Sequence, residues 1–225
     1  GDVYKRQHLV HQCEKERNDM ITDTMYIGSG DITALLSDIH SSSYAKLLQR
    51  FVSGEKPHYN ALASPIDALR TGAILEDVYG KTLPFCYVSQ YKVQSIEMDV
   101  FKASLDFAEI DDGKLKTFIE LKTVSFDEYF DKIVPLESDS EKLAYVRKYK
   151  KHYYNQVQEQ LYCSGLDQAT LAFLCVFEYN DEKNWNREIK DNEITRVTIP
   201  RDDTVIDQIK SRGEIFQRIK DYHIK

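Results

Sequence analysis

A predicted β-hairpin between Met98 and Val124 constrains the fold of this chain more than any other feature of its sequence. Two runs of strand-like composition flank Asp111-Asp112-Gly113, a turn sequence that reverses the chain between paired strands. The first strand is expected from Met98 to Ile110 and the second from Leu115 to Val124. This hairpin is the element with the strongest signal in the sequence.

The hairpin also sorts its polar residues, because successive side chains of a strand point to opposite faces. On the first strand, Lys102, Ser104 and Asp106 share the face opposite the apolar side chains. On the second strand, Glu120 and Lys122 point together away from the core-facing residues. Pairing across the turn can therefore bring Asp106, Glu120 and Lys122 close together.

The remaining elements alternate between helices and strands. A glycine turn and short helix are expected in YIGSGDITALL, with a further helix in SYAKLLQRFV. A further helix is expected from a cap at Ser64, with Pro65 in its first turn, to Tyr79, ahead of a stop at Gly80. Another is expected from Glu141 to Cys163, ended by Gly165, with an apolar stripe of Val146, Tyr149, Tyr153, Val157 and Leu161. A last helix is expected after a cap at Asp202 or Asp203, and further strands are expected at Phe85 to Ile96, Thr170 to Tyr179 and ITRVTI. This order predicts a mixed α/β fold in which a central mixed sheet is flanked by helices. Residues 21–225 are expected to form a single domain, preceded by a disordered or non-native N-terminus at residues 1–20.

The composition is that of an ordinary soluble globular protein, with 225 residues, 42% hydrophobic residues and 30% charged residues. A net charge of −7 argues against binding of polyanions through bulk charge but leaves a local basic patch open. The four scattered cysteines, Cys13, Cys86, Cys163 and Cys175, contain no CxxC pair, which argues against a zinc site. Reduced thiols, and the lack of a signal peptide or membrane-spanning run, predict a cytoplasmic protein that contacts no membrane. That compartment would be the host cytoplasm if the chain is phage-encoded.

Two carboxylates beside a lysine suit one kind of chemistry. Asp106 and Glu120 offer hard oxygen ligands for Mg²⁺, which retains coordination positions for water and phosphate. Lys122 could orient a metal-bound water or stabilise charge on a phosphodiester. The alternative is an ordinary cross-strand ion pair on an exposed face of the sheet.

Several motifs, in order along the chain, add a resemblance to a known family. SLDF and IELKT resemble the central acid and ExK motifs of the PD-(D/E)XK nuclease core, with Leu105 at the proline position. More specifically, the chain resembles the lambda-exonuclease and YqaJ-type phage recombinase nucleases. IGSGDITALL, GAILEDVYG and YYNQVQEQLYCSG are similar to the N-terminal turn, the G-x-x-x-E helix and the Y-x-x-Q-V-Q helix of that family. The resemblance extends from Tyr26 to the C-terminal helix.

The resemblance implies a role for each matching residue. The implied catalytic residues are Glu76, Asp106, Glu120, Lys122 and Gln156. Asp106, Glu120 and the backbone carbonyl of Leu121 would bind metal, and Glu76 would be a further candidate ligand. The implied cofactor is Mg²⁺, two ions per site, with Mn²⁺ as a substitute. Without the resemblance, Glu76 would be an exposed helix residue, and Gln156 would belong to a solvated helix face, as the neighbouring polar residues Gln158, Glu159 and Gln160 suggest.

The resemblance and the charge pattern also imply contacts with DNA. The candidate residues are Ser29, Gly30, Lys102, Ser104, Arg147, Lys150, Lys151 and Tyr153. The segment RKYKKHYY interleaves bases with aromatic residues, which suits contacts with a nucleic-acid strand, although a charged outer helix face is an equal alternative. Tyr153 could equally be a core residue, and Ser104 a small filler. Dependence on a 5′ phosphate is left open, because Gly30 replaces the usual family serine and only Asp23 and the more distant Arg17 lie near the expected arginine position.

The function implied is that of a Mg²⁺-dependent exonuclease that degrades one strand of linear duplex DNA, in the 5′ to 3′ direction, for phage-type recombination by strand annealing. The resemblance further implies a trimeric ring around DNA and a single-strand annealing protein as partner. Two alternatives remain open on the residues alone. One is another PD-(D/E)XK nuclease, such as an endonuclease or a CRISPR-adaptation nuclease. The other is a catalytically silent protein that binds nucleic acid.

Overall fold

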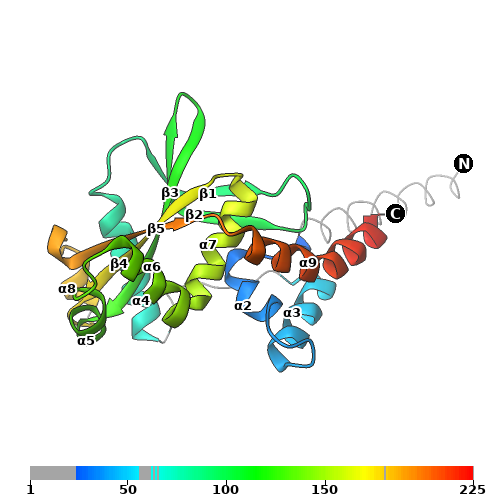
Figure 1. The fold of residues 1–225 in the computed structure, drawn as a ribbon, viewed down its shortest axis with the longest axis horizontal. Coiled ribbons are helices and arrows are strands. Elements are labelled where there is room, and N and C mark those ends of the chain that lie inside the picture. The colour runs from blue at the N-terminus through cyan, green and yellow to red at the C-terminus, as the bar shows by residue number, and fades with distance from the viewer. Residues whose placement is uncertain (1–23, 56–61, 63, 65, 180, 225) are drawn as a thin grey trace, which may run out of the picture.

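One five-stranded sheet organises the computed structural model, which describes residues 24–55, 62, 64, 66–179 and 181–224. The strands are β1 (Tyr87–Gln94), β2 (Lys102–Asp111), β3 (Lys114–Ser125), β4 (Gln168–Val176) and β5 (Ile194–Pro200). They lie side by side in sequence order, with β3 and β4 parallel and all other neighbours antiparallel. The predicted mixed sheet is therefore confirmed, and so is its place between helices (Figure 1).

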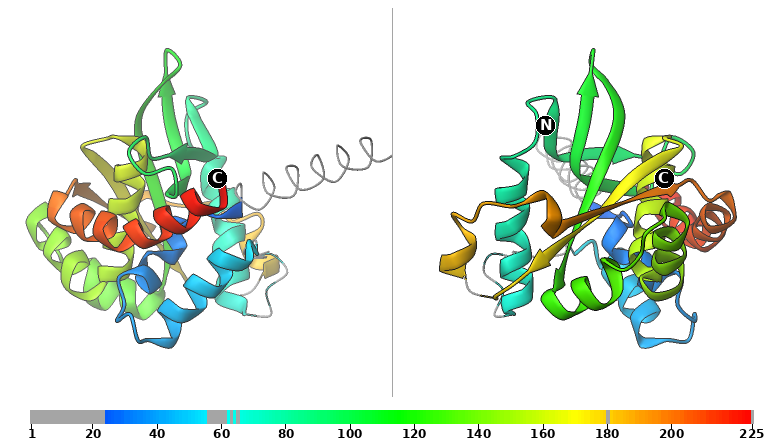
Figure 2. Two further views of the ribbon diagram at one scale, coloured as in Figure 1. Left: turned by 90° about the vertical axis from the view of Figure 1, so that its right-hand side faces the viewer. Right: turned by 60° about the vertical axis from the view of Figure 1, so that its left-hand side comes forward.

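Helices cover both faces of the sheet. In chain order they are η1 (Ser29–Asp31), α2 (Ile32–Leu35), α3 (Ser42–Ser53), α4 (Asp67–Gly80), α5 (Phe126–Glu128), the π-helix η3 (Tyr129–Ile133), α6 (Asp139–Tyr149), α7 (Lys151–Ser164), α8 (Asp181–Asn184), η4 (Asp191–Glu193) and α9 (Asp203–Ile224). The right-hand view of Figure 2 shows α4 on one side of the sheet and α7 and α9 on the other.

The two faces bury separate apolar clusters. Leu75 and Tyr79 of α4 pack with Phe107, Ile119 and Leu121 from the sheet on one side. The larger cluster on the other side joins α2, α3, α7 and α9 to the sheet. Burial on both faces explains why β4 is a nearly continuous apolar run rather than an alternating one.

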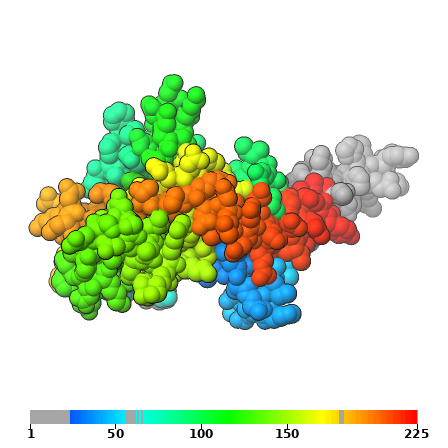
Figure 3. Space-filling model, viewed as in Figure 1, coloured from blue at the N-terminus to red at the C-terminus, as the bar shows by residue number. Residues whose placement is uncertain are grey.

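The hairpin forms where the turn sequence predicts it. Asp112 and Gly113 have φ angles of 50° and 71°, as a tight turn between two twisted strands requires. A register shift between Glu109 and Ile110 bends the paired strands near the turn. The tip of the hairpin projects from the body of the molecule (Figure 3).

The predicted helix from Glu141 to Cys163 is wrong in one respect, because the structure divides it into α6 and α7. The break lies at Lys150, whose φ of −122° and ψ of 35° leave the helical region. Lys150 is fixed there by an ion pair with Glu128 at 2.6 Å. Tyr149, which was expected on the apolar stripe of one long helix, is 61% exposed as a result. Gly165 ends α7 in the left-handed conformation, as predicted.

The start and end of α4 also differ from expectation. Ser64 does not cap the helix; its hydroxyl accepts a hydrogen bond from the Ile66 amide, and Ile66 is the N-cap residue. Pro65, the expected first-turn residue, lies outside the described residues. Gly80 is the last helical residue rather than a stop beyond it, and a β-carbon there would lie 2.8 Å from the Phe107 ring. Glycine therefore permits the close approach of α4 to the sheet.

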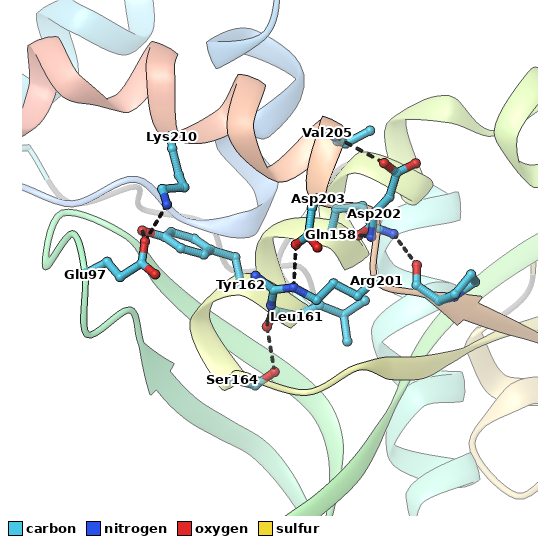
Figure 4. Close-up of polar contacts among 11 residues, drawn as sticks. Glu97, Gln158, Leu161, Tyr162, Ser164, Arg201, Asp202, Asp203, Val205 and Lys210 are labelled. Carbon is cyan, nitrogen blue, oxygen red and sulfur yellow. Dashed lines mark hydrogen bonds and ion pairs between the residues drawn. The ribbon is translucent and has the colours of Figure 1, made fainter.

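A polar joint fixes α7 against the start of α9 (Figure 4). Gln158 donates to the Pro200 carbonyl at 2.9 Å and accepts from the Asp202 amide at 2.7 Å. Arg201 donates to the Leu161 carbonyl and pairs with Asp203. Asp202 caps α9 by accepting from the Val205 amide at 3.3 Å, as predicted. This joint links α7 to the end of β5 and the start of α9.

Three further expectations concern termini, thiols and membranes. The expectation of disorder at residues 1–20 concerns residues outside the described part of the chain. Cys86, Cys163 and Cys175 are free thiols. No helix among the described residues is long and apolar enough to cross a membrane.

Candidate active site

A groove of about 1070 Å³ lies where the N-terminal turn, β1, β2, β3 and α7 meet. Its lining includes the predicted residues Ser29, Gly30, Lys102, Ser104, Asp106, Glu120, Lys122 and Gln156. The structure therefore brings together residues that are far apart in the sequence. Lys102, Ser104 and Asp106 were predicted to share one face of the strand, and all three line the groove.

The floor of the groove lies where the hairpin strands stop pairing. Pairing between β2 and β3 runs from the turn to Phe107 and Ile119, and Asp106 and Glu120 are the next residues beyond that pair. The Leu121 amide donates to Asp106 Oδ2 at 2.9 Å, which fixes this carboxylate across the gap between the strands. Burial and the neighbouring Glu120 carboxylate hold the pKa of Asp106 well above its usual range.

Lys122 supplies the positive charge at this acidic floor. Its Nζ atom lies 2.6 Å from Glu120 Oε1, and the Glu120 side chain is only 1% exposed. Burial favours the neutral amine, but Glu120 and Asp106 together raise the pKa of Lys122 above its ordinary value. The ammonium also lies 5.3 Å from the ring centre of Tyr153. Lys122 is therefore a cation held by two carboxylates and an aromatic face.

Two glutamines from α7 hold Glu120 from the other side. Gln156 Nε2 donates to Glu120 Oε1 at 2.5 Å, and Gln160 Nε2 donates to Glu120 Oε2 at 2.6 Å. Gln160 also donates to the Ser104 carbonyl at 3.1 Å. The alternative of a solvated helix face is wrong, because Gln158, Glu159 and Gln160 are each 0% exposed. Sequence reasoning missed Gln160, although its spacing of four from Gln156 puts both on one helix face.

Glu76 reaches the same centre from α4. It lines a second pocket of about 320 Å³ together with Lys122 and Tyr153, so Lys122 lies between the two hollows. Gln90 Nε2 donates to Glu76 Oε1 at 2.5 Å. Burial raises the pKa of Glu76, with a smaller opposing effect from the Gln90 hydrogen bond. The alternative that Glu76 is simply an exposed helix residue does not describe this environment.

The N-terminal turn forms one end of the groove. Asp31 accepts from the Gly28 amide at 2.9 Å and pairs with Arg50 at 2.6 Å. The sequence showed no arginine at the expected upstream position, whereas the fold brings Arg50 of α3 to the turn from downstream. Asp23 and Arg17 lie outside the described residues.

A buried carboxyl group lies beneath that turn. The Cys163 thiol donates to Glu159, with Sγ 3.1 Å from Glu159 Oε1. Glu159 Oε2 is buried and makes no hydrogen bond within the described part of the chain. Burial raises the pKa of Glu159 to about 8, which favours the protonated acid.

Four predicted DNA contacts lie outside the groove lining. Arg147 donates to the Tyr154 hydroxyl and lies 3.8 Å from Asp202, near the start of α9. Lys150 pairs with Glu128, and Lys151 is exposed on α7. Tyr153 lines the smaller pocket instead of the groove. These four residues thus lie outside the groove, although the Tyr153 ring still contacts the Lys122 ammonium.

A divalent metal fits the donor set at the floor of the groove. Among the residues that the structure describes, no group of three or more His, Cys, Asp or Glu side chains is arranged to hold a metal ion. Mg²⁺, however, is commonly bound through one or two carboxylates, with waters and substrate phosphates completing its shell. Asp106 and Glu120 supply such carboxylates, and the Lys122 ammonium shows that this position attracts positive charge. The donor chemistry therefore suits Mg²⁺ or Mn²⁺.

Comparison with known proteins places the fold among exonucleases. No family model and no curated protein sequence matches the chain. An alkaline exonuclease, LHK-Exo from Laribacter hongkongensis, is similar with a TM-score of 0.60 and 16% identity, over 92% of this chain and 93% of that chain. The structure of LHK-Exo in complex with dAMP is similar to the same degree, at 15% identity. A phage-related exonuclease from Haemophilus somnus 129PT has a TM-score of 0.56 and 18% identity, over 88% of this chain and 95% of that chain.

The chain therefore has the fold of these solved exonucleases over most of its length. This confirms the fold that the sequence resemblance implied. Identities of 15% to 18% establish the fold, while the roles of individual residues rest on the geometry of the groove.

Proposed function

We propose that this protein is a Mg²⁺-dependent DNA exonuclease that degrades one strand of linear duplex DNA. The observation that carries the proposal is the arrangement of Asp106, Glu120 and Lys122 at the floor of an open groove. Two carboxylates paired with a lysine match the requirements of phosphodiester hydrolysis assisted by a metal. The likeness to solved exonucleases over 92% of the chain supports the same assignment.

Different residues of the site bind the metal, stabilise charge on the phosphate and position the reacting groups. Asp106, Glu120 and the Leu121 carbonyl would hold Mg²⁺ or Mn²⁺, two ions per site, with Glu76 beside them. When bound, the metal supplies charge neutralisation at the phosphate and a more acidic water. Lys122 holds a proton at Nζ and stabilises negative charge that develops on the phosphate.

Glutamine and serine side chains set the positions of these groups. Gln156 and Gln160 fix both oxygens of Glu120. Ser104 and Lys102 line the groove beside Asp106, where a hydroxyl and an ammonium can contact DNA phosphates. Ser29 and Gly30 line its end, where backbone amides of a turn suit an anion.

The finer features of the reaction are part of the proposal. Digestion would run 5′ to 3′, release mononucleotides and leave a 3′ overhang for recombination by strand annealing. The complex of LHK-Exo with dAMP supports a mononucleotide as a ligand of this kind of site. A trimeric ring and an annealing protein as partner would complete the process, in the cytoplasm. A ring with lysines toward its bore would reconcile DNA binding with the net charge of −7.

End-labelled DNA tests the proposal. Linear duplex labelled at either end, with and without a 5′ phosphate, is incubated with Mg²⁺ or with EDTA. The proposal expects loss of one strand from its 5′ end with Mg²⁺ and no digestion with EDTA. Equal digestion in EDTA, or an intact linear substrate at all Mg²⁺ and Mn²⁺ concentrations, would refute it.

Closed-circular DNA separates the proposal from its rivals. An exonuclease leaves closed-circular duplex intact, whereas an endonuclease on the same core converts it to nicked or linear forms. A silent DNA-binding protein would retard both substrates in a gel without altering either. The buried Lys122–Glu120 pair in an open groove favours an enzyme over a silent scaffold.

A further inference from the structure

Gln90 has an unusual backbone conformation in the middle of an edge strand. Its φ angle is 54°, a left-handed value that residues other than glycine adopt rarely. Pairing of β1 with β2 runs from Tyr87 to Ser89, is interrupted at Gln90, and resumes at Tyr91. A backbone of this kind is strained for a residue other than glycine and is typically retained where the site requires it.

The distorted backbone directs the Gln90 side chain to two residues of the candidate site. Its Nε2 atom donates to Glu76 Oε1 at 2.5 Å, and its Oε1 atom accepts from the Ser104 hydroxyl at 2.7 Å. The side-chain amide donates in one contact and accepts in the other, so the two hydrogen bonds together fix its orientation. Gln90 thereby links α4 to β2, the strand that also carries Asp106.

This link acts at the edge of the carboxylate centre. Glu76 is close enough to Glu120, Lys122 and Asp106 to interact with them electrostatically. Glu76 lies on α4, which is a separate element from β2. Without the hydrogen bond from the Gln90 amide, the Glu76 carboxylate would be free to rotate relative to β2. The Ser104 hydroxyl faces the groove two residues before Asp106.

We propose that Gln90 is a positioning residue that aligns the Glu76 carboxylate and the Ser104 hydroxyl on either side of the reacting phosphate. This inference rests on the proposed nuclease function and assigns a residue of β1 to it. Gln90 acts through Glu76 and Ser104, so its loss affects turnover more than DNA binding. Partners of this kind typically contribute 10- to 100-fold, roughly, to activity or metal affinity.

Two substitutions of Gln90 test the proposal. Gln90→Ala should lower kcat about 10- to 100-fold with little change in KM for duplex DNA. Gln90→Glu preserves the shape of the side chain but places a carboxylate against Glu76, so it should be less active than Gln90→Ala. Val88→Ala, at a position on the same strand that is 43% exposed, is the matched control for disturbance of the strand.

A double-mutant cycle with Glu76→Gln distinguishes positioning from a general structural role. If Gln90 acts through Glu76, Gln90→Ala causes a smaller loss in the Glu76→Gln background than in the wild type. Equal losses in both backgrounds, or a Gln90→Glu variant as active as the wild type, would overturn the inference. Gln90→Gly relieves the left-handed backbone, so the expected result is a higher Tm together with lower kcat.

Failure of this inference and failure of the proposed function have different signatures. A wild-type protein without nuclease activity in Mg²⁺ or Mn²⁺ would overturn both. An active wild type accompanied by a fully active Gln90→Ala variant would overturn only the role of Gln90.

Discussion

Gln160 Nε2 lies 2.6 Å from Glu120 Oε2, and both side chains are almost completely buried. Gln156, one turn earlier on α7, holds the other oxygen of the same carboxylate. Glu120 thus has its orientation set by a helix that follows it by more than thirty residues in the chain. A buried carboxylate held in this way is costly unless its hydrogen bonds and counter-charge are kept.

Gln160→Leu should therefore destabilise the fold by about 1–3 kcal/mol, because it leaves a buried oxygen of Glu120 without this donor. It should also weaken Mn²⁺ binding, since Glu120 loses its fixed orientation. Gln158→Leu is the matched control: Gln158 is equally buried on α7 but contacts Pro200 and Asp202. Denaturant unfolding and Mn²⁺ titration of both variants check the prediction, which is contradicted if the two variants bind Mn²⁺ equally well.

Lys122→Met should abolish cleavage, by about 10²- to 10⁴-fold, while duplex binding is retained. Without the ammonium, Glu120 and Asp106 lose their counter-charge, so the metal-free variant should have a lower Tm. Added Mn²⁺ should then raise Tm by more than it does in the wild type, because no internal cation competes for the carboxylates. Thermal unfolding with and without Mn²⁺ measures this, and cleavage at the wild-type rate would remove Lys122 from the mechanism.

Local signals in the sequence were sufficient to predict the hairpin, the cap of α9 and the end of α7. Asp112 and Gly113 have φ angles of 50° and 71°, values that aspartate and glycine tolerate better than most residues do. Gly165 behaves in the same way at the end of α7. Alternation along β2 and β3 likewise placed Asp106, Glu120 and Lys122 on one wall, because a two-residue period leaves few other arrangements.

The features that the sequence did not predict involve contacts between segments that are distant in the chain. The helix breaks at Lys150, which pairs with Glu128, and no local propensity signals this break. Gln158, Glu159 and Gln160 look like a solvated run, and only partners elsewhere in the fold make their burial favourable. The strand pattern from Phe85 to Ile96 does not reveal the left-handed backbone at Gln90, whose side chain contacts Glu76 and Ser104.

Glu159→Gln should change the dependence of stability on pH. The pKa of Glu159 is raised from 4.5 to about 8, so the folded state holds this proton more tightly than the unfolded state. Its contribution therefore favours folding at low pH and is lost as pH rises from about 4.5 to 8. The neutral amide removes this dependence, so the variant should match the wild type near pH 4 and have the higher Tm above about pH 8. A Tm difference between the two proteins that stays constant across this pH range would contradict the assignment.

Lys102→Ala should weaken duplex binding and reduce the slope of log K against log salt by about 1, as expected for one phosphate contact. Lys102 lines the groove beside Ser104 and Asp106, where a DNA strand would pass. Arg218→Ala is the control, since Arg218 is 80% exposed on α9 and pairs with Glu214. Fluorescence anisotropy at several salt concentrations gives both slopes. Equal slopes for wild type and Lys102→Ala would exclude a phosphate contact at Lys102.

Isothermal titration of Mn²⁺ into the wild-type protein and into Asp106→Asn tests the central claim most directly, because it asks whether the hairpin carboxylates hold a divalent cation. The account predicts saturable binding to the wild type and an affinity at least about tenfold weaker in the variant, since an uncharged amide is a poorer ligand for a hard cation. Equal binding by the two proteins, or no binding by the wild type, would contradict it.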